Sequence, residues 1–268
     1  MRRDQVPDSW SAGVAGYEAM FEPFTGGYAD AAVDLLDIGP THAVLDVAAG
    51  AGAVALRAGR RGAAVLATDF APGMVERLAE RFAAEGLDRC RAEVMDGQAL
   101  TVADGSFDAC TSMFGLIFFP DLDAGVRELA RAARPGGSVC VGTWHVAQFP
   151  LATLVAAALG EVIDGFAAPP GPPTWARLGD VDSIAAHLTA AGLVDVEVVP
   201  VRRRWVFEDP EAFFRSQPSW SPPVQPLFDG LDDDTIDRAA EAFAAALART
   251  GDANGLDVEA LLGVGRST

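Results

Sequence analysis

The chain has 268 residues, 50% of them apolar, and carries 38 acidic against 20 basic side chains, a formal net charge of −18. This excess of negative charge repels polyanions, so we expect neither DNA nor RNA as a partner. No apolar run reaches the roughly 18 residues of a bilayer span, and no signal-type segment follows Arg2 and Arg3, which predicts a soluble cytoplasmic protein that binds no membrane. The 3 cysteines have no metal-ligand spacing, so no metal site is expected.

The N-terminal segment 8–36 has helical spacing of apolar residues, interrupted at Pro23 and at Gly26-Gly27, which predicts two short helices. Short apolar runs then alternate with helical patterns up to about His145. The predicted strands are 43–47, 64–68, 90–95, 107–113 and 138–143, and the predicted helices between them are 54–61, 73–85 and 122–133. This alternation predicts a parallel sheet with helices on both faces.

The second half of the chain is less regular. It contains predicted helices at 151–163, 181–191, 210–216 and 232–249, strands at 195–207 and 258–265, and a proline-rich loop at 169–173. We expect a single domain over residues 1–268, with lid helices at 1–36 and cap insertions at 146–179 and 209–250.

The first predicted strand ends in the glycine-rich turn Ala48-Ala49-Gly50-Ala51-Gly52. Glycines in a strand-to-helix turn let a ligand approach the backbone closely. The spacing Gly50-x-Gly52-x-x-Ala55 also fits the dinucleotide fingerprint of NAD(P)-dependent oxidoreductases. Asp46, near the end of the strand, would repel a pyrophosphate but suits the cationic amino acid end of S-adenosylmethionine (SAM). Its charge favours SAM.

Two more acids follow the next two predicted strands. Asp69 can accept hydrogen bonds from both hydroxyls of a ribose, and Asp96 can accept one from an adenine amino group. Each acid alone is equally well explained as the cap of a helix or turn. Three acids after three successive strands form a specific nucleoside-binding pattern.

From about Trp10 to Val146 the sequence resembles the class I SAM-dependent methyltransferases, specifically the UbiE-like and methyltransferase-11/25 group. The glycine turn matches motif I of this family, with Ala48 in place of the more usual first glycine. The resemblance implies an α/β fold, a Rossmann-like seven-stranded sheet of order 3-2-1-4-5-7-6 with the last strand antiparallel and helical cap elements. It also implies that Arg134-Pro135-Gly136-Gly137 forms a tight connection between a helix and the fifth strand.

The resemblance further implies that SAM is the methyl donor and S-adenosylhomocysteine (SAH) the product. Asp69 would hold the ribose, Phe70 and Met74 would flank the adenine, and residues 96–98 would read its edge. The full set of implied cofactor-binding residues is Asp46, Ala48, Gly50, Gly52, Asp69, Phe70, Met74, Asp96, Gly97, Gln98, Ser112 and Met113.

The acceptor is expected beyond the carboxyl ends of the strands, under the lid and cap segments. Aromatic residues gather in these segments, which predicts a small apolar or aromatic acceptor shielded from water. The candidate acceptor-binding residues are Tyr17, Tyr28, Phe114, Trp144, Phe149, Trp175 and Trp220. His145, at the end of the fifth strand, is the candidate catalytic base for an acceptor that holds a proton.

Two other function classes remain open at this stage. An NAD(P)-dependent oxidoreductase is opposed by Asp46 and by the absence of lysine from the whole chain. A SAM-binding protein that does not methylate, such as a cyclase or a binding module, is compatible with the same motifs. The lack of lysine beside abundant alanine, glycine and arginine is typical of GC-rich bacterial genomes, which suggests specialised metabolism. We expect a monomer or homodimer.

Overall fold

The computed structural model describes residues 2–167, 175, 177–251 and 253–268, and it is built around one seven-stranded sheet. The strands are β1 (Ala43–Val47), β2 (Ala64–Asp69), β3 (Cys90–Val94), β4 (Phe107–Met113), β5 (Ala133–Trp144), β6 (Val194–Val206) and β7 (Gly255–Arg266). Their order is β3-β2-β1-β4-β5-β7-β6, and β7 runs antiparallel to both neighbours. The predicted α/β fold, strand order and antiparallel last strand are confirmed.

Continuous apolar runs place β1 in the centre of the sheet. Strands of a parallel sheet are covered on both faces, so nearly every side chain is apolar. Val44 and Leu45 are fully buried, and Leu45 pairs with Leu66 of β2 on one side and Cys110 of β4 on the other. The carboxyl end of this buried strand therefore lies at one edge of the sheet, where the turn after β1 begins.

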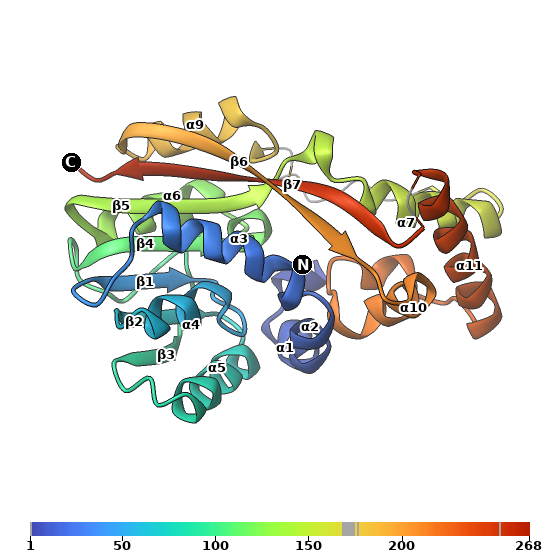
Figure 1. Ribbon diagram of the computed structural model, residues 1–268, viewed down its shortest axis with the longest axis horizontal. Helices are drawn as coiled ribbons and strands as arrows, with labels where there is room; N and C mark the ends of the chain where they lie inside the picture. The colour runs from blue at the N-terminus through green and yellow to red at the C-terminus, as the bar shows by residue number, and fades with distance from the viewer. Residues whose placement is uncertain (1, 168–174, 176, 252) are drawn as a thin grey trace.

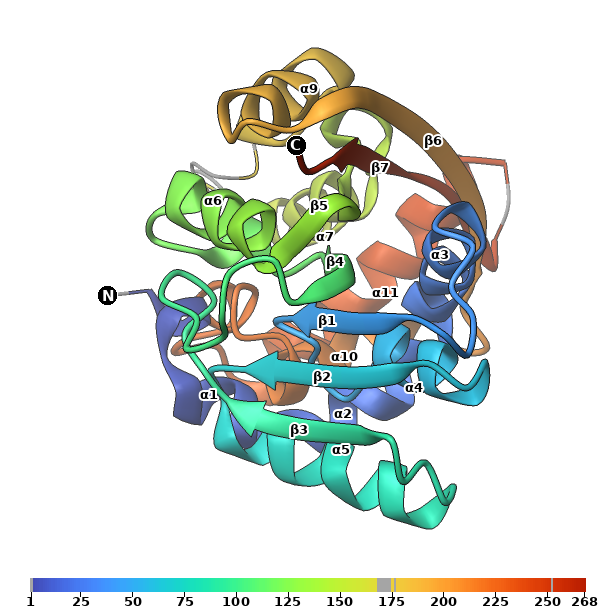
Figure 2. The same cartoon turned by 90° about the vertical axis from the view of Figure 1, so that its left-hand side faces the viewer.

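Helices cover the two faces of the sheet (Figure 2). One face carries α3 (Glu22–Leu35), α4 (Ala53–Arg60) and α5 (Pro72–Ala84), and the other carries α6 (Leu122–Ala132) and α9 (Val181–Ala190). The amphipathic spacing in these segments explains this placement because each helix buries one apolar stripe against the strands. None of the helices in the described ranges combines the length and apolar character that spanning a bilayer requires.

A second group of helices lies beyond the carboxyl ends of β1, β4 and β5 (Figure 1). This helical lobe consists of α7 (Leu151–Val162), α10 (Pro210–Trp220) and α11 (Asp233–Arg249), with α11 packed against both others. Phe214 and Phe243 are fully buried between them. Strands β6 and β7 are longer than β1 to β4 and extend into the lobe, so the lobe is continuous with the sheet.

The N-terminal segment differs from its prediction of two short helices. It forms η1 (Arg3–Gln5), α1 (Pro7–Ala12), α2 (Val14–Met20) and then α3, which begins at Glu22, next to the predicted interruption at Pro23, and continues through the one predicted at Gly26-Gly27. Pro23 stands in the first turn of α3, where no backbone donor is needed. A Cβ on Gly26 would lie 2.5 Å from the guanidinium of Arg57, so this glycine permits a close helix contact rather than ending the helix.

The connection between α6 and β5 also differs from its prediction. The Arg134–Gly137 motif lies within β5, and α6 ends directly before it. Ala133 pairs with Phe107, and the register then shifts before Ser138 pairs with Ala109, with Gly136 in the left-handed region at φ 76°. The motif is therefore a bulge in the strand. The predicted loop at 169–173 lies outside the described residues.

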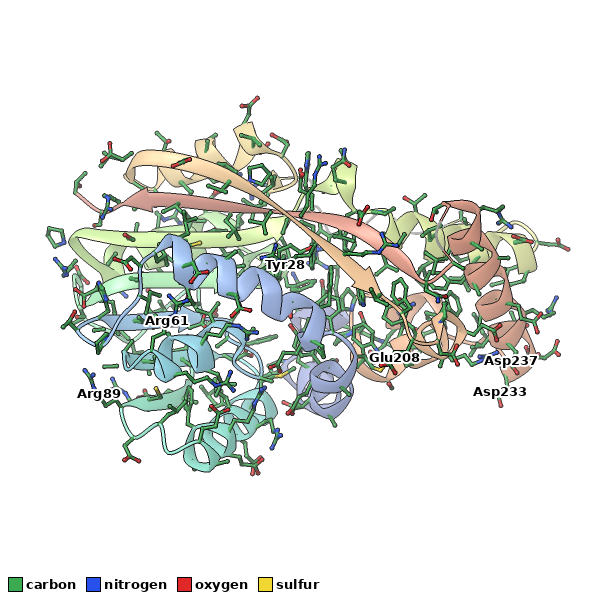
Figure 3. All side chains as sticks on the ribbon, viewed as in Figure 1. Tyr28, Arg61, Arg89, Glu208, Asp233 and Asp237 are labelled. Carbon is green, nitrogen blue, oxygen red and sulfur yellow. The ribbon has the colours of Figure 1, made fainter. Side chains whose placement is uncertain are left out.

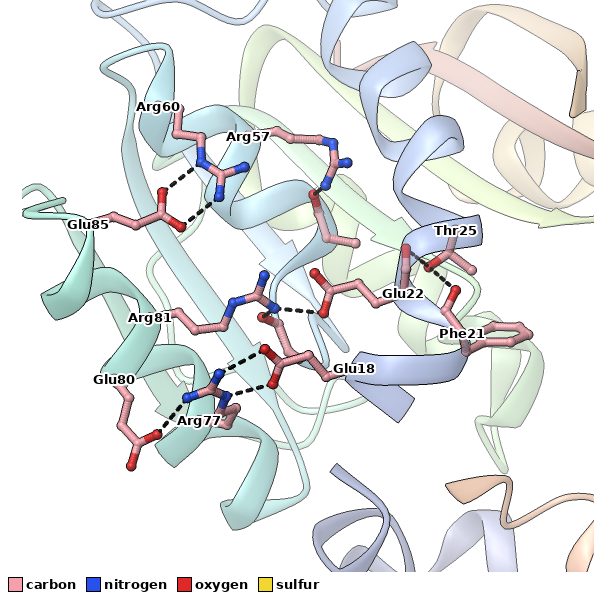
Figure 4. Close-up of polar contacts among 12 residues, drawn as sticks. Glu18, Phe21, Glu22, Thr25, Arg57, Arg60, Arg77, Glu80, Arg81 and Glu85 are labelled. Carbon is pink, nitrogen blue, oxygen red and sulfur yellow. Dashed lines mark hydrogen bonds and ion pairs between the residues drawn. The ribbon is translucent and has the colours of Figure 1, made fainter. Parts of the chain in front are cut away.

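Two ion pairs attach the N-terminal helices to α5 (Figure 4). Glu18 of α2 receives two hydrogen bonds from Arg77, at 2.6 and 2.8 Å, and Glu22 of α3 receives one from Arg81 at 2.6 Å. Arg81 also donates to the carbonyl of Ala51 at 2.9 Å. The turn after β1 is therefore connected through Arg81 to the helix that covers it.

Substitution of Gly263 by alanine tests the packing of α9 on β7. The added Cβ would lie 2.3 Å from Cγ2 of Ile184 and 2.9 Å from Cδ1 of Leu188. We expect Gly263→Ala to lower the free energy of unfolding by about 1–3 kcal/mol, because overpacking displaces buried side chains. Urea denaturation measures this, with Gly39→Ala as the control, since its Cβ finds its nearest neighbour at 4.0 Å. Equal stabilities of the two variants would contradict the packing.

Candidate active site

A cavity of about 1010 Å³ lies at the carboxyl ends of the parallel strands. Its floor comes from the residues that follow β1 to β5, and its walls come from all three predicted lid and cap segments. The N-terminal helices contribute Trp10, Tyr17 and Phe21; the segment after β5 contributes Phe149, Leu151 and Trp175; the segment after β6 contributes Gln217, Trp220 and Leu227. The cavity is thus assembled from segments far apart in the chain.

The turn after β1 takes three left-handed backbone conformations within five residues. Ala48 has φ 54°, Gly50 φ 55° and Gly52 φ 105°. Only glycine fits at Gly52, because a Cβ there would lie 2.3 Å from Leu78, whereas Gly50 exposes its backbone to the cavity beside the ring of Tyr17. Ala48 stands where motif I usually has its first glycine. It adopts the left-handed conformation although its Cβ makes this conformation less favourable than it would be for glycine. The turn therefore presents backbone to a ligand on the cavity floor.

Asp69 fastens this turn to the end of β2. One carboxylate oxygen accepts from the backbone N–H of Gly50 and the other from that of Ala71, both at 2.9 Å. Burial raises the pKa of Asp69 to about 6, against the opposing effect of these backbone donors. A carboxylate has about four acceptor positions, so two backbone donors leave room for two hydroxyl groups of a ligand in the cavity.

Asp46 is not part of the wall of this cavity. Its oxygens accept from the hydroxyl of Thr111 at 2.8 Å and from the backbone N–H of Ala55, in the first turn of α4, at 3.1 Å. Burial raises its pKa to about 7. The carboxylate lines a separate recess of about 20 Å³ behind Tyr17 and Ala48. The structure therefore gives Asp46 a structural connection between β1, β4 and α4, and does not bring it to the large cavity.

The turn after β3 supplies the other polar part of the floor. Asp96, Gly97 and Gln98 line the cavity, and one oxygen of Asp96 accepts from both the backbone N–H and the side-chain amide of Gln98 at 2.9 Å. A Cβ on Gly97 would lie 2.5 Å from Phe119, so the turn needs glycine here. Phe70 and Met74 lie on the same wall. The polar edge and the apolar flanks expected for an adenine site thus line one cavity.

The remaining implied cofactor residues divide into two groups. Ala48, Gly50 and Met113 line the cavity, whereas Gly52 and Ser112 do not. Ser112 is fully buried, and its hydroxyl has no hydrogen-bond partner among the described residues. Side chains alternate along a strand, which explains why Met113 lines the cavity and its neighbour Ser112 does not.

The rest of the wall is aromatic. Trp144 stacks on Phe114 with ring centroids 4.0 Å apart and on Phe149 at 4.8 Å. Phe114 has φ 61°, a left-handed conformation that is rare for a large side chain and recurs at functional sites. Tyr17, Trp175 and Trp220 also line the cavity as predicted. An apolar ligand with a flat ring system suits such a wall.

Four aromatic residues of this wall are not among the predicted site residues. They are Trp10, Phe21, Phe118 and Phe119. The spacing of Trp10, Tyr17 and Phe21 follows i, i+7 and i+11, the pattern of one face of a helical segment, and this signal was available in the sequence. The two phenylalanines in and after η2 (Leu116–Phe118) belong to a short element whose position only the tertiary structure defines.

Tyr28 does not line the cavity. It lies on α3 in the middle of the molecule (Figure 3), where its side chain is fully buried. The hydroxyl donates to the backbone carbonyl of Val258 on β7 at 2.9 Å. Burial raises the pKa of Tyr28, because the anion would lose its solvation. The prediction that Tyr28 binds the acceptor is therefore corrected: this side chain holds α3 against the sheet.

His145 follows Trp144 but is absent from the cavity wall. Its backbone is extended, so the two neighbouring side chains point to opposite faces. The imidazole Nδ1 lies 2.6 Å from one oxygen of Glu259, and the other oxygen accepts from Arg202 at 2.6 Å. The structure thus brings His145 into a polar cluster on the strand face away from the cavity, not to the predicted position of a catalytic base.

Comparison with known proteins agrees with this architecture. Residues 44–137 match the family model described as methyltransferase domain. An uncharacterized protein of Mycobacterium tuberculosis is 39% identical over 140 residues, covering 52% of this chain and 50% of that protein. The demethylmenaquinone methyltransferase of Corynebacterium glutamicum is 38% identical over 117 residues, covering 43% and 47%. The chain therefore spans about half the length of these curated relatives, and the predicted resemblance is confirmed.

Solved structures share the fold at low sequence identity. The YcgJ protein of Bacillus subtilis aligns with a TM-score of 0.61 and 17% identity, covering 90% of this chain and 98% of that one. The phosphoethanolamine N-methyltransferase 2 of Haemonchus contortus, in complex with phosphomonomethylethanolamine and SAH, aligns at 0.59 and 18%, covering 97% and 58%. At such identities the likeness extends to the fold alone.

Proposed function

Because residues 44–137 match the family model described as methyltransferase domain, we propose that this protein transfers the methyl group of SAM to a small apolar or aromatic acceptor. One observation carries the proposal. Two carboxylates at the ends of β2 and β3 and an exposed backbone turn after β1 open onto the same aromatic cavity. A nucleoside fits the polar floor, and a flat acceptor fits the walls.

The floor residues have the donors and acceptors that SAM requires. Asp69 accepts from the ribose hydroxyls, Asp96 and the Gly97-Gln98 backbone read the adenine edge, and Phe70 and Met74 flank the ring. Ala48, Gly50 and Met113 border the methionine end. When bound, SAM supplies an electrophilic methyl group on a sulfonium. The SAH complex of the structurally similar Haemonchus enzyme supports this cofactor, although its identity to this chain is only 18%.

The volume and lining of the cavity support a second ligand. Ligand sites measure roughly 300–1,000 Å³, and this cavity of about 1010 Å³ lies at the upper end of that range, which supports space for cofactor and acceptor together. Substitution at a sulfonium requires the acceptor, the methyl carbon and the sulfur in line, so rigid positioning supplies much of the acceleration. The aromatic walls from α1, α2, α7 and α10 hold the acceptor and exclude water.

A base at the cavity is not required in this mechanism. Among the carboxylates on its wall, Asp69 and Asp96 are assigned to the cofactor, and Asp4 is paired with Arg2 at 3.0 Å. The acceptor therefore reacts in a form that ionises in solution or through an uncharged nucleophile. We place the acceptor in bacterial specialised metabolism, and the lysine-free composition supports the bacterial assignment. We place the enzyme in the cytoplasm, as a monomer or homodimer.

Loss of the Asp69 carboxylate tests the cofactor assignment. We expect wild type to bind SAH and SAM with micromolar affinity and to show no response to NADH. Asp69→Ala should weaken SAH binding by about tenfold or more, because hydrogen bonds to a charged group contribute about 1.5–3 kcal/mol each. Isothermal titration calorimetry with all three ligands measures this.

The matched control is Asp88→Ala, an exposed aspartate in the turn before β3 at the other end of the sheet. It should leave SAH affinity within about twofold of wild type. Binding of NADH without SAH would instead establish the oxidoreductase alternative and refute the proposal.

The pH dependence of SAH binding tests the role of the Asp69 charge. The folded protein holds the pKa of this buried carboxyl at about 6, so it is protonated at pH 5 and ionised at pH 7.5. The ionised form accepts from the ribose hydroxyls, so SAH affinity should rise by up to about tenfold per pH unit below pH 6 and level off above it. Calorimetry from pH 5 to 8 measures this, and Asp69→Asn should abolish the step near pH 6. A pH-independent wild type would contradict the assignment.

Substitution of His145 tests whether a base acts from the end of β5. Because its imidazole faces Glu259 outside the cavity, His145→Asn should keep kcat within about threefold of wild type, whereas loss of a general base costs about 10²–10⁴-fold. Once an acceptor is identified, the pH profile of kcat should follow the ionisation of that acceptor in both proteins. A loss of a hundredfold, with the neutral-pH limb of the profile removed, would restore His145 as the base.

A further inference from the structure

One glutamine side chain connects the turn after β3 to the start of α6. The side-chain oxygen of Gln98 accepts from the backbone N–H of Asp121 at 2.7 Å, and its side-chain nitrogen donates to Oδ1 of Asp96 at 2.9 Å. Asp121 caps α6, where its carboxylate accepts from the backbone N–H of Ala124 at 2.9 Å. A single amide therefore links a carboxylate of the cavity floor to the first turn of a helix.

The partner on α6 determines which way this amide points. A backbone N–H can only donate, so the group that faces Asp121 must be the carbonyl oxygen of the glutamine side chain. The NH2 group of Gln98 consequently faces Asp96, and one of its hydrogens is directed at the carboxylate. The bond to Asp121 thus fixes the donor side of Gln98 toward the floor of the cavity.

The segment that anchors Gln98 is closely packed. Phe119 and Pro120, directly before Asp121, line the cavity. A Cβ on Gly97 would lie 2.5 Å from Cζ of Phe119, and a Cβ on Gly125 of α6 would lie 2.6 Å from Cδ2 of the same ring. The turn after β3 therefore contacts the anchoring segment on a second side, which holds Gln98 in place.

The two oxygens of Asp96 have different surroundings. Oδ1 accepts from both the side-chain amide and the backbone N–H of Gln98, each at 2.9 Å, whereas no residue in the described part of the chain donates to Oδ2. Two donors occupy the two lone pairs of one carboxylate oxygen. The acceptor capacity that remains for a ligand is that of Oδ2, and a group that meets it must donate a hydrogen bond.

We propose that the side chain of Gln98 is a positioning residue for cofactor selection. It turns the carboxylate of Asp96 so that Oδ2 meets the 6-amino group of the cofactor purine, and it does not itself contact the purine. The inference rests on the proposed function, because it concerns how the same cavity selects its cofactor. Gln98 thereby makes the site prefer a purine with a donor at position 6 over one that lacks it.

A matched pair of ligands measures this preference. SAH and 6-deamino-SAH, the analogue in which hydrogen replaces the 6-amino group, differ only in the group that Asp96 meets. Isothermal titration calorimetry at pH 7.5 gives the ratio of their affinities in wild type and in Gln98→Met. Methionine keeps the unbranched shape of glutamine but lacks its amide. Gln148→Met, an exposed residue that does not line the cavity, is the control.

We expect wild type to bind SAH about tenfold or more tightly than 6-deamino-SAH, as a hydrogen bond to a charged group requires. Gln98→Met should lower this ratio by about threefold to tenfold, because the carboxylate is no longer held in one orientation, and the control should keep it. Gln98→Glu separates the two bonds of the amide, since at pH 7.5 it still accepts from Asp121 but cannot donate to Asp96. It should lower the ratio as well.

The same change should have the opposite effect in an Asp96→Asn background. There Gln98 donates to the asparagine oxygen and directs the asparagine NH2 group at the 6-amino group, so two donors face each other and the ratio falls to about one or below. Adding Gln98→Met frees this amide to turn its oxygen toward the ligand, and the ratio should rise by about threefold. A glutamine that only supports the fold would shift both ratios in the same direction.

A ratio that Gln98→Met and Gln98→Glu leave unchanged, or shifts of the same sign in the Asp96 and Asp96→Asn backgrounds, overturns the inference. Titration of wild type with SAH alone distinguishes this failure from failure of the proposed function. SAH binding with an unchanged ratio rejects only the role of Gln98, whereas absence of SAH binding rejects the cofactor assignment and this inference with it.

Discussion

The site depends on one buried carboxylate that holds two strand ends together. Asp69 accepts from Gly50 in the turn after β1 and from Ala71 in the turn after β2. The turn after β1 contains left-handed residues at Ala48, Gly50 and Gly52, a conformation that local interactions alone would not favour. Parallel pairing of β1 with β2 places Asp69 beside that turn, so the sheet order is what makes the geometry of the floor available.

The fold was predictable where local pattern and tertiary environment agree. Parallel strands buried on both faces are apolar throughout, and the helices between them carry one apolar stripe, so sequence analysis located both kinds of element up to β5. The predicted helix and strand boundaries are wrong where a glycine that often interrupts such elements instead serves a contact or a bulge in the tertiary structure. Gly26 permits contact between α3 and Arg57, and Gly136 forms a bulge within β5; both facts depend on neighbours distant in the chain.

The site was predictable by strand end but not by side-chain direction. Every parallel strand ends at the same edge, so the acids after β2 and β3 were placed correctly on the cavity from spacing alone. Whether a residue at a strand end faces the cavity depends on the register and twist of the sheet. Trp144 and His145 are adjacent, yet only Trp144 faces the ligand space, and Asp46 is turned toward Thr111 and α4. A sequence motif therefore locates the turn after a strand, but the packing of the sheet and helices determines which side chains of that turn face the cavity.

Phe21 makes several of the ring contacts that couple the lid to the scaffold. Phe21, between α2 and α3, contacts Tyr17 on its own segment, Trp144 at the end of β5, Trp205 on β6 and Trp220 on α10. These contacts join the N-terminal helices to the end of β5, to β6 and to α10. The residues that would touch an acceptor are therefore the same ones that stabilise the enclosure. Acceptor specificity in such a cavity therefore evolves under the constraint of packing, because a substitution that reshapes the wall also disturbs the contacts that hold it together.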